Sequence, residues 1–414
     1  MKHVLVFLVL TLPVELAARN VLMIVIDDMR VDERAETPNL DALAIQSTRY
    51  RNAYTTVPSC LASRTSVLSG LSPATHGFTR SGIGFVELHD AFFADPEIET
   101  VPRLMASAGY YTAAGGKVFH RQLADQWDEV GPFIPYTDQY GPLAAGDDGT
   151  FIDAAPLPDG ETHPDQLTAT WAVEFLAEQE QPFFLAVGFY RPHLPWRLPA
   201  EYYDLYHFTQ PHIPSATVLQ GEPEEALALA NHPVIANIPL YDWIANAGKA
   251  GDYTRYYLAA ITHTDAMIGQ VLDALVAHGH DATTDIVVWS DHGFHLGEHR
   301  HWKKNTLWQE SVRVPLIIRA AGLAQGDVDV PVSLLDVGPT ILDFAGLEPS
   351  VQFEGVSLRS GASPVEVYYN DGRALVNAER KLIDYDLNRP GTDHMVEYDL
   401  VNDPGENDPL PPGC

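Results

Sequence analysis

The chain has 414 residues, of which 46% are apolar, so it is long enough to bury a large core in one or more domains. Its 25 lysines and arginines stand against 56 aspartates and glutamates, which gives a formal net charge of −31. This balance argues against a nucleic-acid partner, because phosphate binding needs a basic surface. It does not exclude a small anionic substrate, since a pocket can concentrate a few cations.

The N-terminal segment has the pattern of a cleavable export signal. Met1, Lys2 and His3 precede an apolar run, and small residues follow at Ala17 and Ala18. The alternative is a cytoplasmic start just before the first strand. Because the apolar run is too short to span a bilayer, we expect a periplasmic or secreted protein with no membrane span.

Apolar runs and helical patterns alternate along the first part of the chain. A short run of continuous apolar residues predicts a strand that is buried on both faces, as in the middle of a parallel sheet. Their alternation with helices predicts an α/β fold, a mainly parallel sheet sandwiched by helices. The strands are predicted at residues 20–26, 110–114, 183–189 and 285–289, and the helices at residues 39–46, 61–68, 101–108, 165–178 and 253–277.

Other segments have a different character. Residues 121–160 are rich in glycine, proline and aspartate and predict a surface excursion, and the proline-rich residues 210–250 give no clear pattern. Short alternating strands then predict a small antiparallel sheet in a C-terminal subdomain. The predicted strands are residues 366–370, 374–377, 380–385 and 394–400, and the predicted domains are a signal at 1–18, a main α/β domain at 19–350 and the subdomain at 351–414.

Acidic residues follow two of the predicted strands. Asp27 and Asp28 end the first, Asp291 and His292 end the last, and the proline-rich loop 191–195 follows a third. Ligands of such sheets bind outside the carboxyl ends of the strands, so these groups are expected to share one site. Gathered carboxylates favour a cation such as Ca²⁺ or Mg²⁺, and the histidine also allows Mn²⁺ or Zn²⁺. The alternative, for any single aspartate, is a cap on the next helix.

Cys60 begins a predicted helix and is one of only two cysteines, the other being Cys414. A cysteine at a helix N-terminus has a lowered pKa and can act as a nucleophile. Arg64 follows one turn later and could stabilise an anion. The alternatives are a small buried thiol or a bridge to Cys414, against which the context of Cys60 argues.

Scarce cationic groups gather in three further motifs, Gly116–His120, Arg191–His193 and His301–Lys304. Each places a lysine or histidine beside a turn or a helix start. Such groups can hold an oxyanion or donate a proton to a leaving group. Any one of them alone is more often a solvated surface residue.

Several motifs together resemble the type I sulfatases of the alkaline-phosphatase-like superfamily, and most closely the iduronate-2-sulfatase branch. They occur in the family's order over nearly the whole chain. The matching segments are NVLMIVIDDMR, TPNLDALA, NAYTTVPSCLASRTSVLSG, GGKVFH, FFLAVGFYRPHLPW, SDHGFHLGEHRHWKKN and YDLVNDPGENDPL.

The resemblance implies that a maturation enzyme oxidises Cys60, in a Cys-x-(Pro/Ala)-x-Arg motif, to formylglycine. One hydroxyl of the hydrated aldehyde would attack sulfur, so that the sugar alcohol leaves and a covalent sulfo-enzyme forms. The other hydroxyl would then expel sulfate and regenerate the aldehyde. The resemblance also implies one Ca²⁺ ion per chain, which would act as Lewis acid and template. Its ligands would be Asp27, Asp28, Asp291, His292 and the converted Cys60.

The remaining roles are implied by the same resemblance. Arg64 would steady the hydrate, and Lys117 with His120 would lie near the hydrate and the sulfate oxygens. His193 and Lys304 would lie on the leaving-group side, with His193 as the general acid. Lys117, His193 and Lys304 would therefore also bind substrate, and Arg191 could meet a substrate carboxylate.

The resemblance implies a sulfated sugar or oligosaccharide as substrate, such as a 2-O-sulfated uronic acid. Because pocket-forming loops are expected around Trp196 and Trp302, we predict that sulfate is removed at a chain end. Position 62 is alanine where many members have proline, which leaves the maturation route open between formylglycine-generating and radical enzymes. Two alternatives remain. One is a phosphate or phosphonate ester hydrolase of the same superfamily, and the other is an unmatured protein that binds sulfated glycans.

Overall fold

The structure is a computed structural model that describes residues 19–80, 84–134, 154–158, 160–206, 221–232, 234–235 and 237–411. The predicted export signal at residues 1–18 and Cys414 lie outside these residues, as does much of the predicted surface excursion. Within the described part of the chain, no helix is both long enough and apolar enough to cross a membrane.

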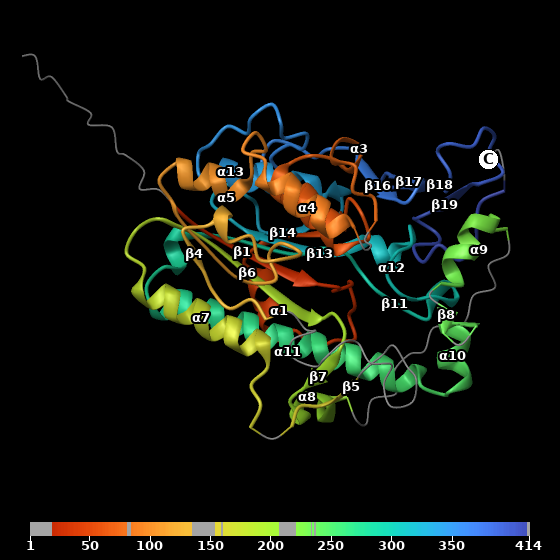
Figure 1. Ribbon diagram of the computed structural model, residues 1–414, viewed down its shortest axis with the longest axis horizontal. Coiled ribbons are helices and arrows are strands. Elements are labelled where there is room, and N and C mark those ends of the chain that lie inside the picture. The colour runs from red at the N-terminus through yellow and green to blue at the C-terminus, as the bar shows by residue number, and fades with distance from the viewer. Residues whose placement is uncertain are drawn as a thin grey trace, which may run out of the picture.

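A nine-stranded sheet forms the centre of the molecule (Figure 1). Its strand order is β14-β2-β13-β10-β1-β6-β3-β4, and β15 pairs with β2. Strands β10, β1, β6 and β3 run parallel to one another, whereas β13 runs antiparallel to β10 and β2. The prediction of a mainly parallel sheet is confirmed. The strands are β1 (Asn20–Asp27), β2 (Thr48–Tyr54), β3 (Tyr111–Gly116), β4 (Glu129–Val130), β6 (Phe183–Pro192), β10 (Thr284–Ser290), β13 (Arg313–Arg319), β14 (Gly326–Val328) and β15 (Val332–Ser333).

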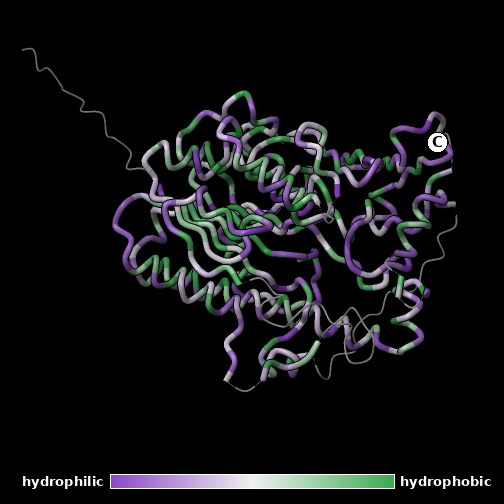
Figure 2. The backbone as a smooth tube through the Cα atoms, viewed as in Figure 1, coloured by the Kyte–Doolittle hydropathy of each residue, from purple (hydrophilic) through white to green (hydrophobic). Residues whose placement is uncertain are grey.

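Helices cover both faces of this sheet and explain its continuous apolar runs. Alternate residues of β1 point into two separate cores, Leu22 and Ile24 into one and Met23 and Val25 into the other. The sheet accordingly lies at the hydrophobic centre of the molecule (Figure 2). The first core is closed by α1 (Pro38–Ile45), α7 (Pro164–Glu178) and α11 (Ala250–Ala277), and the second by α2 (Cys60–Ser69), α4 (Phe85–Ala94), α5 (Val101–Ser107) and α13 (Val337–Phe344).

Short elements surround the sheet and carry most of the connecting loops. They include two helices and a hairpin in the segment that gave no clear sequence pattern. These elements are α3 (Pro73–His76), η1 (Ala124–Gln126), β5 (Ala154–Pro156), β7 (Trp196–Leu198), α8 (Ala200–Leu205), α9 (Glu224–Ala230), β8 (Val234–Ile235), β9 (Ile238–Pro239), α10 (Leu240–Asn246), η2 (Asp281–Thr283), β11 (His295–Leu296), η3 (Glu298–Arg300), β12 (Trp302–Lys303), α12 (Gln309–Val312) and η4 (Leu334–Asp336).

The C-terminal part forms a second, antiparallel sheet, as predicted. Its order is β16-β17-β18-β19, so each strand pairs with its neighbour in the sequence. One face packs against Tyr54, Leu307 and Trp308 of the main part. The domain boundary near residue 350 stays a prediction. The strands are β16 (Val365–Tyr369), β17 (Gly372–Val376), β18 (Arg380–Asp384) and β19 (Met395–Asp399).

Candidate functional site

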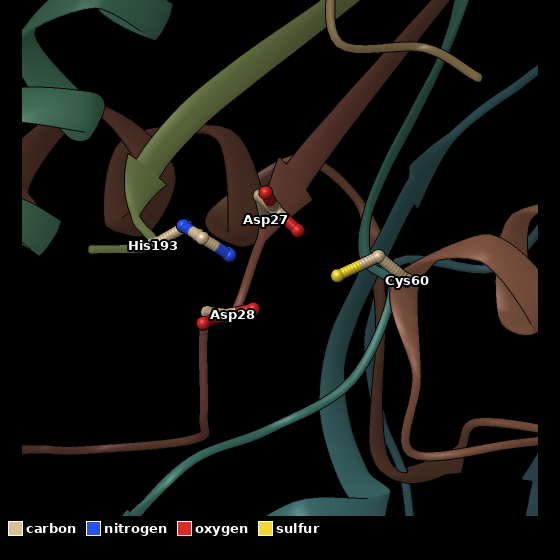
Figure 3. Close-up of side chains that lie close together, drawn as sticks. All are labelled: Asp27, Asp28, Cys60 and His193. Atoms are coloured by element: carbon tan, nitrogen blue, oxygen red, sulfur yellow. The ribbon is translucent and has the colours of Figure 1, made fainter. Parts of the chain in front are cut away.

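The carboxyl ends of β1, β6 and β10 meet at one edge of the main sheet. The register places Ile26 beside Ser290 on β10, and Asp27 beside Pro192 at the end of β6. The backbone N–H of Asp291 donates to Ile26 O at 3.2 Å, and that of His193 donates to Asp27 O at 3.1 Å. Figure 3 shows Asp27, Asp28 and His193 around one space with Cys60 on its other side.

Asp28 leaves β1 in a left-handed conformation, with a φ of 69°. Aspartate tolerates this conformation better than most residues. Its backbone N–H donates to Asp291 Oδ1 at 3.1 Å, and its carbonyl accepts from the Tyr257 hydroxyl at 2.7 Å. These contacts fix the turn that places two consecutive carboxylates at the site.

Cys60 is the first residue of α2, and its thiol lies at the centre of the cluster. Its Sγ is 3.2 Å from His292 Nε2, and Lys304 Nζ donates to it at 3.0 Å. Burial and the charge of Asp27 raise the pKa of the thiol, but Lys117 and Lys304 outweigh them and the pKa is lowered. The position therefore favours an anionic side chain.

Arg64 lies one helical turn after Cys60 and is fully buried. Its Nε donates to Asp291 Oδ2 at 2.8 Å, and its Nη2 is 3.4 Å from Asp27 Oδ1. Its Nη1 donates to the carbonyls of Lys117 and Val118. Burial alone would lower the pKa of Arg64, but the two aspartates raise it. The guanidinium thus joins α2 to three other loops of the site.

Lys117 follows β3 and forms a buried ion pair with Asp27. The preceding Gly116 has a φ of 69°, and a Cβ there would lie 1.9 Å from the carbonyl oxygen of Gly188. Only glycine fits this close approach of β3 to β6. Burial lowers the pKa of Lys117, but Asp27 and Cys60 raise it overall. Burial raises the pKa of Asp27, but Lys117 and its neighbours lower it well below its usual range.

Lys304 reaches Cys60 from the loop after β12. Its Nζ donates to Asp28 Oδ1 at 2.6 Å. Burial lowers the pKa of its ammonium, but Asp28 and Cys60 raise it well above the usual value. The two lysines therefore stay charged in the neighbourhood of the thiol.

The two site histidines each use Nδ1 to contact a backbone carbonyl. His292 Nδ1 is 3.0 Å from Gly293 O, and His193 Nδ1 contacts Leu194 O. This arrangement directs Nε2 of His292 at the cluster, as is common for metal-ligating histidines. Burial lowers the pKa of His292, but Asp291 and other neighbours raise it to about 9. Burial dominates at His193 and lowers its pKa to about 3.

The ligand types in this cluster fit a divalent cation. Two overlapping groups have ligand atoms that all lie within 4.8 Å of one another. Asp27 Oδ1 is buried with no hydrogen-bond partner in the described part of the chain. The three carboxylates in these groups suit a hard cation, and the two imidazoles can add nitrogen ligands. The groups are Asp27, Asp28, Cys60 and His193, and Asp27, Cys60, Asp291 and His292.

The other predicted residues lie next to this cluster. Burial, and after it the neighbouring charge of Lys117, lower the pKa of His120 to about 3. Arg191 is 1% exposed, and its Nη1 donates to His193 O at 2.8 Å, so it braces the His193 loop. Its contact with a substrate carboxylate stays a prediction. The indoles of Trp196 and Trp302 are buried in the core, so neither offers a free face to a sugar.

Sequence reasoning missed residues that hold these loops. Asp165 accepts the backbone N–H groups of Tyr190 and Arg191 at 2.8 and 2.9 Å. Together with His163 and His263 it forms a second group with metal-ligand types. However, His163 Nδ1 already accepts the N–H of Asp165 as the cap of α7, and the two imidazoles pack edge to face. That cluster is explained by capping and packing.

Comparison with known proteins finds two families and several relatives that match this chain. The family described as sulfatase matches residues 19–347, and that described as N-sulphoglucosamine sulphohydrolase, C-terminal, matches residues 297–410. A sulfatase of Formosa agariphila is 30% identical over 94% of this chain and 82% of its own length. Mouse iduronate 2-sulfatase is 30% identical over 74% of this chain, but the match spans only 60% of the mouse enzyme.

Solved structures agree on the fold. A protein crystallised with its substrate D-glucosamine-2-N,6-O-disulfate has a TM-score of 0.75 at 21% identity, covering 95% of this chain and 93% of that one. The phosphonate monoester hydrolase of Silicibacter pomeroyi has a TM-score of 0.72 at 24% identity, covering 94% and 90%. At these identities the likeness establishes the alkaline-phosphatase-like fold and no particular substrate.

Proposed function

Since this chain belongs to the sulfatase family and is a sulfuric ester hydrolase, we propose that it removes sulfate from a sulfated carbohydrate at the site around Cys60. The observation that carries the proposal is the position of the Cys60 thiol, 3.0 Å from Lys304 Nζ and 3.2 Å from His292 Nε2. The side chains around this thiol include lysines that can hold an anion and carboxylates that can hold a cation.

We infer that the working form of Cys60 is formylglycine, whose hydrated aldehyde supplies a hydroxyl nucleophile. The motif Cys60-x-Ala62-x-Arg64 supports this conversion and calls for a maturation enzyme that accepts alanine at the third position. Arg64 would then hold Asp27 and Asp291 in place beside the new oxygen. Lys117 and Lys304 would bind the sulfate oxygens from two sides, where their charges stabilise the transition state.

His193 is the proposed general acid for the sugar oxygen that leaves. In the free site its pKa is lowered to about 3 by burial, so it is neutral at pH 7. A bound sulfate anion favours the protonated imidazole and raises this pKa. The proton can then pass from Nε2 to the leaving oxygen, while Nδ1 remains on Leu194 O.

We propose Ca²⁺ as the bound cation, held by Asp27, Asp28, Asp291 and His292 together with an oxygen of the converted Cys60. The ion would polarise the sulfate ester and help to orient it. Removal with a chelator is expected to abolish sulfate release. Calcium at a hundred times its Kd is expected to stabilise the metal-free chain by about 2.7 kcal/mol. A thermal unfolding scan with calcium, and with Asp28→Asn as the matched control, measures this, and equal midpoints with and without calcium would contradict it.

The proposed substrate is a 2-O-sulfated uronic acid at the end of a glycan chain. Support comes from the similarity to iduronate 2-sulfatase. Arg191 is the candidate partner for the uronate carboxylate, since its Nε has no hydrogen-bond partner in the described residues. Release of sulfate from internal sugars with chain ends left intact would refute this assignment.

The deciding experiment is mass spectrometry of the Cys60 peptide from the native host, followed by a panel of defined sulfated oligosaccharides. Conversion lowers the peptide mass by about 18 Da. Cys60→Ser serves as the unconverted control and is expected to release no sulfate. An unmodified thiol, with glycan binding but no sulfate release, would instead support a binding protein.

A phosphonate or phosphate ester hydrolase is the second candidate, because a phosphonate monoester hydrolase has the same fold. Paired aryl sulfate, phosphate and phosphonate esters would separate the two. Faster hydrolysis of the phosphorus esters would favour the second candidate. Export through residues 1–18 and a subdomain boundary near residue 350 are also proposals, tested by N-terminal sequencing and by limited proteolysis.

A further inference from the structure

The loop that carries Lys304 has an unfavourable backbone. Residues other than glycine rarely adopt positive φ angles, and they keep them only where the surroundings enforce them. Lys304 reaches the site from the middle of this loop, so the position of its ammonium depends on what holds the loop. The residues with positive φ are His299, Arg300, Lys303 and Asn305, at 51°, 55°, 78° and 75°.

Two consecutive residues of the C-terminal segment hold the two ends of this loop. His299 Nε2 lies 3.1 Å from the backbone oxygen of Gly405. The backbone N–H of Gln309 donates to Glu406 Oε2 at 2.9 Å. Lys304 lies midway in the sequence between these two anchor points. Gly405 and Glu406 belong to the closing sequence motif, for which the proposed chemistry has no other use.

Contacts inside the loop transmit this restraint to Lys304. His301 Nε2 lies 2.9 Å from the backbone oxygen of Lys304. His295 Nε2 lies 2.7 Å from Thr306 Oγ1, which in turn donates to Ser311 Oγ at 3.0 Å. The His299 ring also stacks on an indole at the end of the loop. The backbone on both sides of Lys304 is therefore tied to the same buried framework.

Glu406 can act as an anchor because its charge is paired. Lys381 Nζ on β18 lies 2.8 Å from Glu406 Oε1, and both side chains are fully buried. Burial raises the pKa of Glu406 and lowers that of Lys381, so each charge depends on the other. Removing one partner of such a pair leaves an uncompensated charge in the interior.

We propose that Glu406, paired with Lys381, is a positioning residue for sulfate ester hydrolysis, which acts on Lys304 through the loop of residues 299–309. It does not touch the substrate. The C-terminal antiparallel sheet thus contributes to the reaction by fixing a cation of the site. This inference rests on the role proposed above for Lys304.

Glu406→Gln tests it with little change of shape. The amide oxygen can still accept from Gln309, but the charge is lost and Lys381 is left unpaired. We expect kcat to fall roughly tenfold to a hundredfold with KM little changed. Amide hydrogen exchange over residues 295–306 is expected to accelerate. Lys381→Met combined with Glu406→Gln removes both charges and is expected to recover most of the rate.

Asp336→Asn is the matched control, because it also alters a buried carboxylate. Asp336 accepts from the N–H groups of Val356 and Ser363 at 3.0 and 2.9 Å, far from the loop in sequence. It is expected to lower stability without faster exchange over residues 295–306. Unchanged exchange there in Glu406→Gln, or the same acceleration in Asp336→Asn, overturns the proposal. If Lys304→Ala keeps full activity, the proposed function fails, while the exchange data still test the positioning.

Discussion

Lys117 and Lys304 flank the same thiol but are delivered by different kinds of structure. Lys117 follows the parallel strand β3 of the main sheet and pairs with Asp27, and its backbone N–H donates to Gly188 O at 2.8 Å. Lys304 lies on an irregular loop outside the main sheet and pairs with Asp28. The first is fixed by the core of the main sheet, whereas the second depends on contacts with the C-terminal segment. The main sheet therefore positions one half of the site, and contacts with the C-terminal segment position the other half.

The largest difference between Lys117 and Lys304 is expected when each lysine is replaced by alanine. Either change removes a cation from the sulfate oxygens and is expected to lower kcat by about 10² to 10³. Their effects on stability are expected to differ. Lys117→Ala removes the shorter of the two ion pairs of the fully buried Asp27, leaving the pair with Arg64, and is expected to cost about 3 kcal/mol of unfolding free energy without calcium. Lys304→Ala, at a less buried pair, is expected to cost about 1 kcal/mol.

Urea unfolding with and without calcium measures the difference in unfolding free energy between Lys117→Ala and Lys304→Ala. Lys249→Ala serves as a lysine control outside the site. Calcium is expected to reduce the difference between the stability losses of the two variants, because the ion compensates the charge of Asp27. Equal stability losses for the two variants in the absence of calcium would show that both lysines are held in the same way.

A second, smaller contrast concerns acid. His295, His299 and His301 lie around the Lys304 loop, and burial lowers the pKa of each, to about 4 for His301. Because these folded-state values lie below the usual value of about 6.5, the unfolded chain binds protons first as the pH falls. The free energy of unfolding is therefore unaffected by the protonation of these histidines above about pH 6.5. As the pH falls toward 4, it decreases by up to about 1.4 kcal/mol per histidine and pH unit.

Hydrogen exchange at pH 7 and pH 5 tests this contrast. Residues 295–306 are expected to lose protection before residues 111–118, where His120 is the neighbouring buried histidine. His301→Gln keeps an N–H donor for Lys304 O and is expected to reduce the acid sensitivity. His278→Gln, at an exposed position, is the control. Loss of protection in both segments at the same pH would remove the distinction.

The smallest effect is expected at Tyr190, which lies beside Lys117. Lys117 Nζ is 5.7 Å from the centre of its ring, and its buried hydroxyl has no hydrogen-bond partner in the described residues. The ring, and not the hydroxyl, is therefore expected to support the lysine. Tyr190→Phe is expected to change stability and the activation free energy by less than about 0.5 kcal/mol. A larger loss of kcat, with Tyr190→Leu as the ring-free comparison, would assign the hydroxyl a role at the site.

The burial of a strand explains whether the sequence could predict it. The runs at 20–26, 183–189 and 285–289 predicted β1, β6 and β10 because these strands are buried on both faces. Strands β2 and β13 were not predicted. Arg49 and Arg51 interrupt the apolar pattern of β2 and pair with Asp327 near the sheet edge. A strand with one charged, exposed face gives a weak signal.

The site shows the same limit. The end of a parallel strand predicts where Asp27 and Asp291 meet, because the carboxyl ends of neighbouring strands share an edge. No spacing rule brings Lys304 to Asp28, since 276 residues separate them. That assignment came from the resemblance to the sulfatases. Asp165, Tyr257 and Glu406 hold the site through backbone contacts and carry no local pattern that could have revealed them.

The burial of α2 has a consequence for biogenesis. All ten residues of this helix are buried, and Cys60 stands in its first turn. An enzyme that modifies Cys60 must bind the neighbouring residues as an accessible peptide, and the folded chain does not offer them. Modification would therefore have to precede folding, while the chain is still emerging from the ribosome or crossing a membrane. The yield of active protein would then depend on the relative rates of modification and folding, and not on the stability of the folded protein.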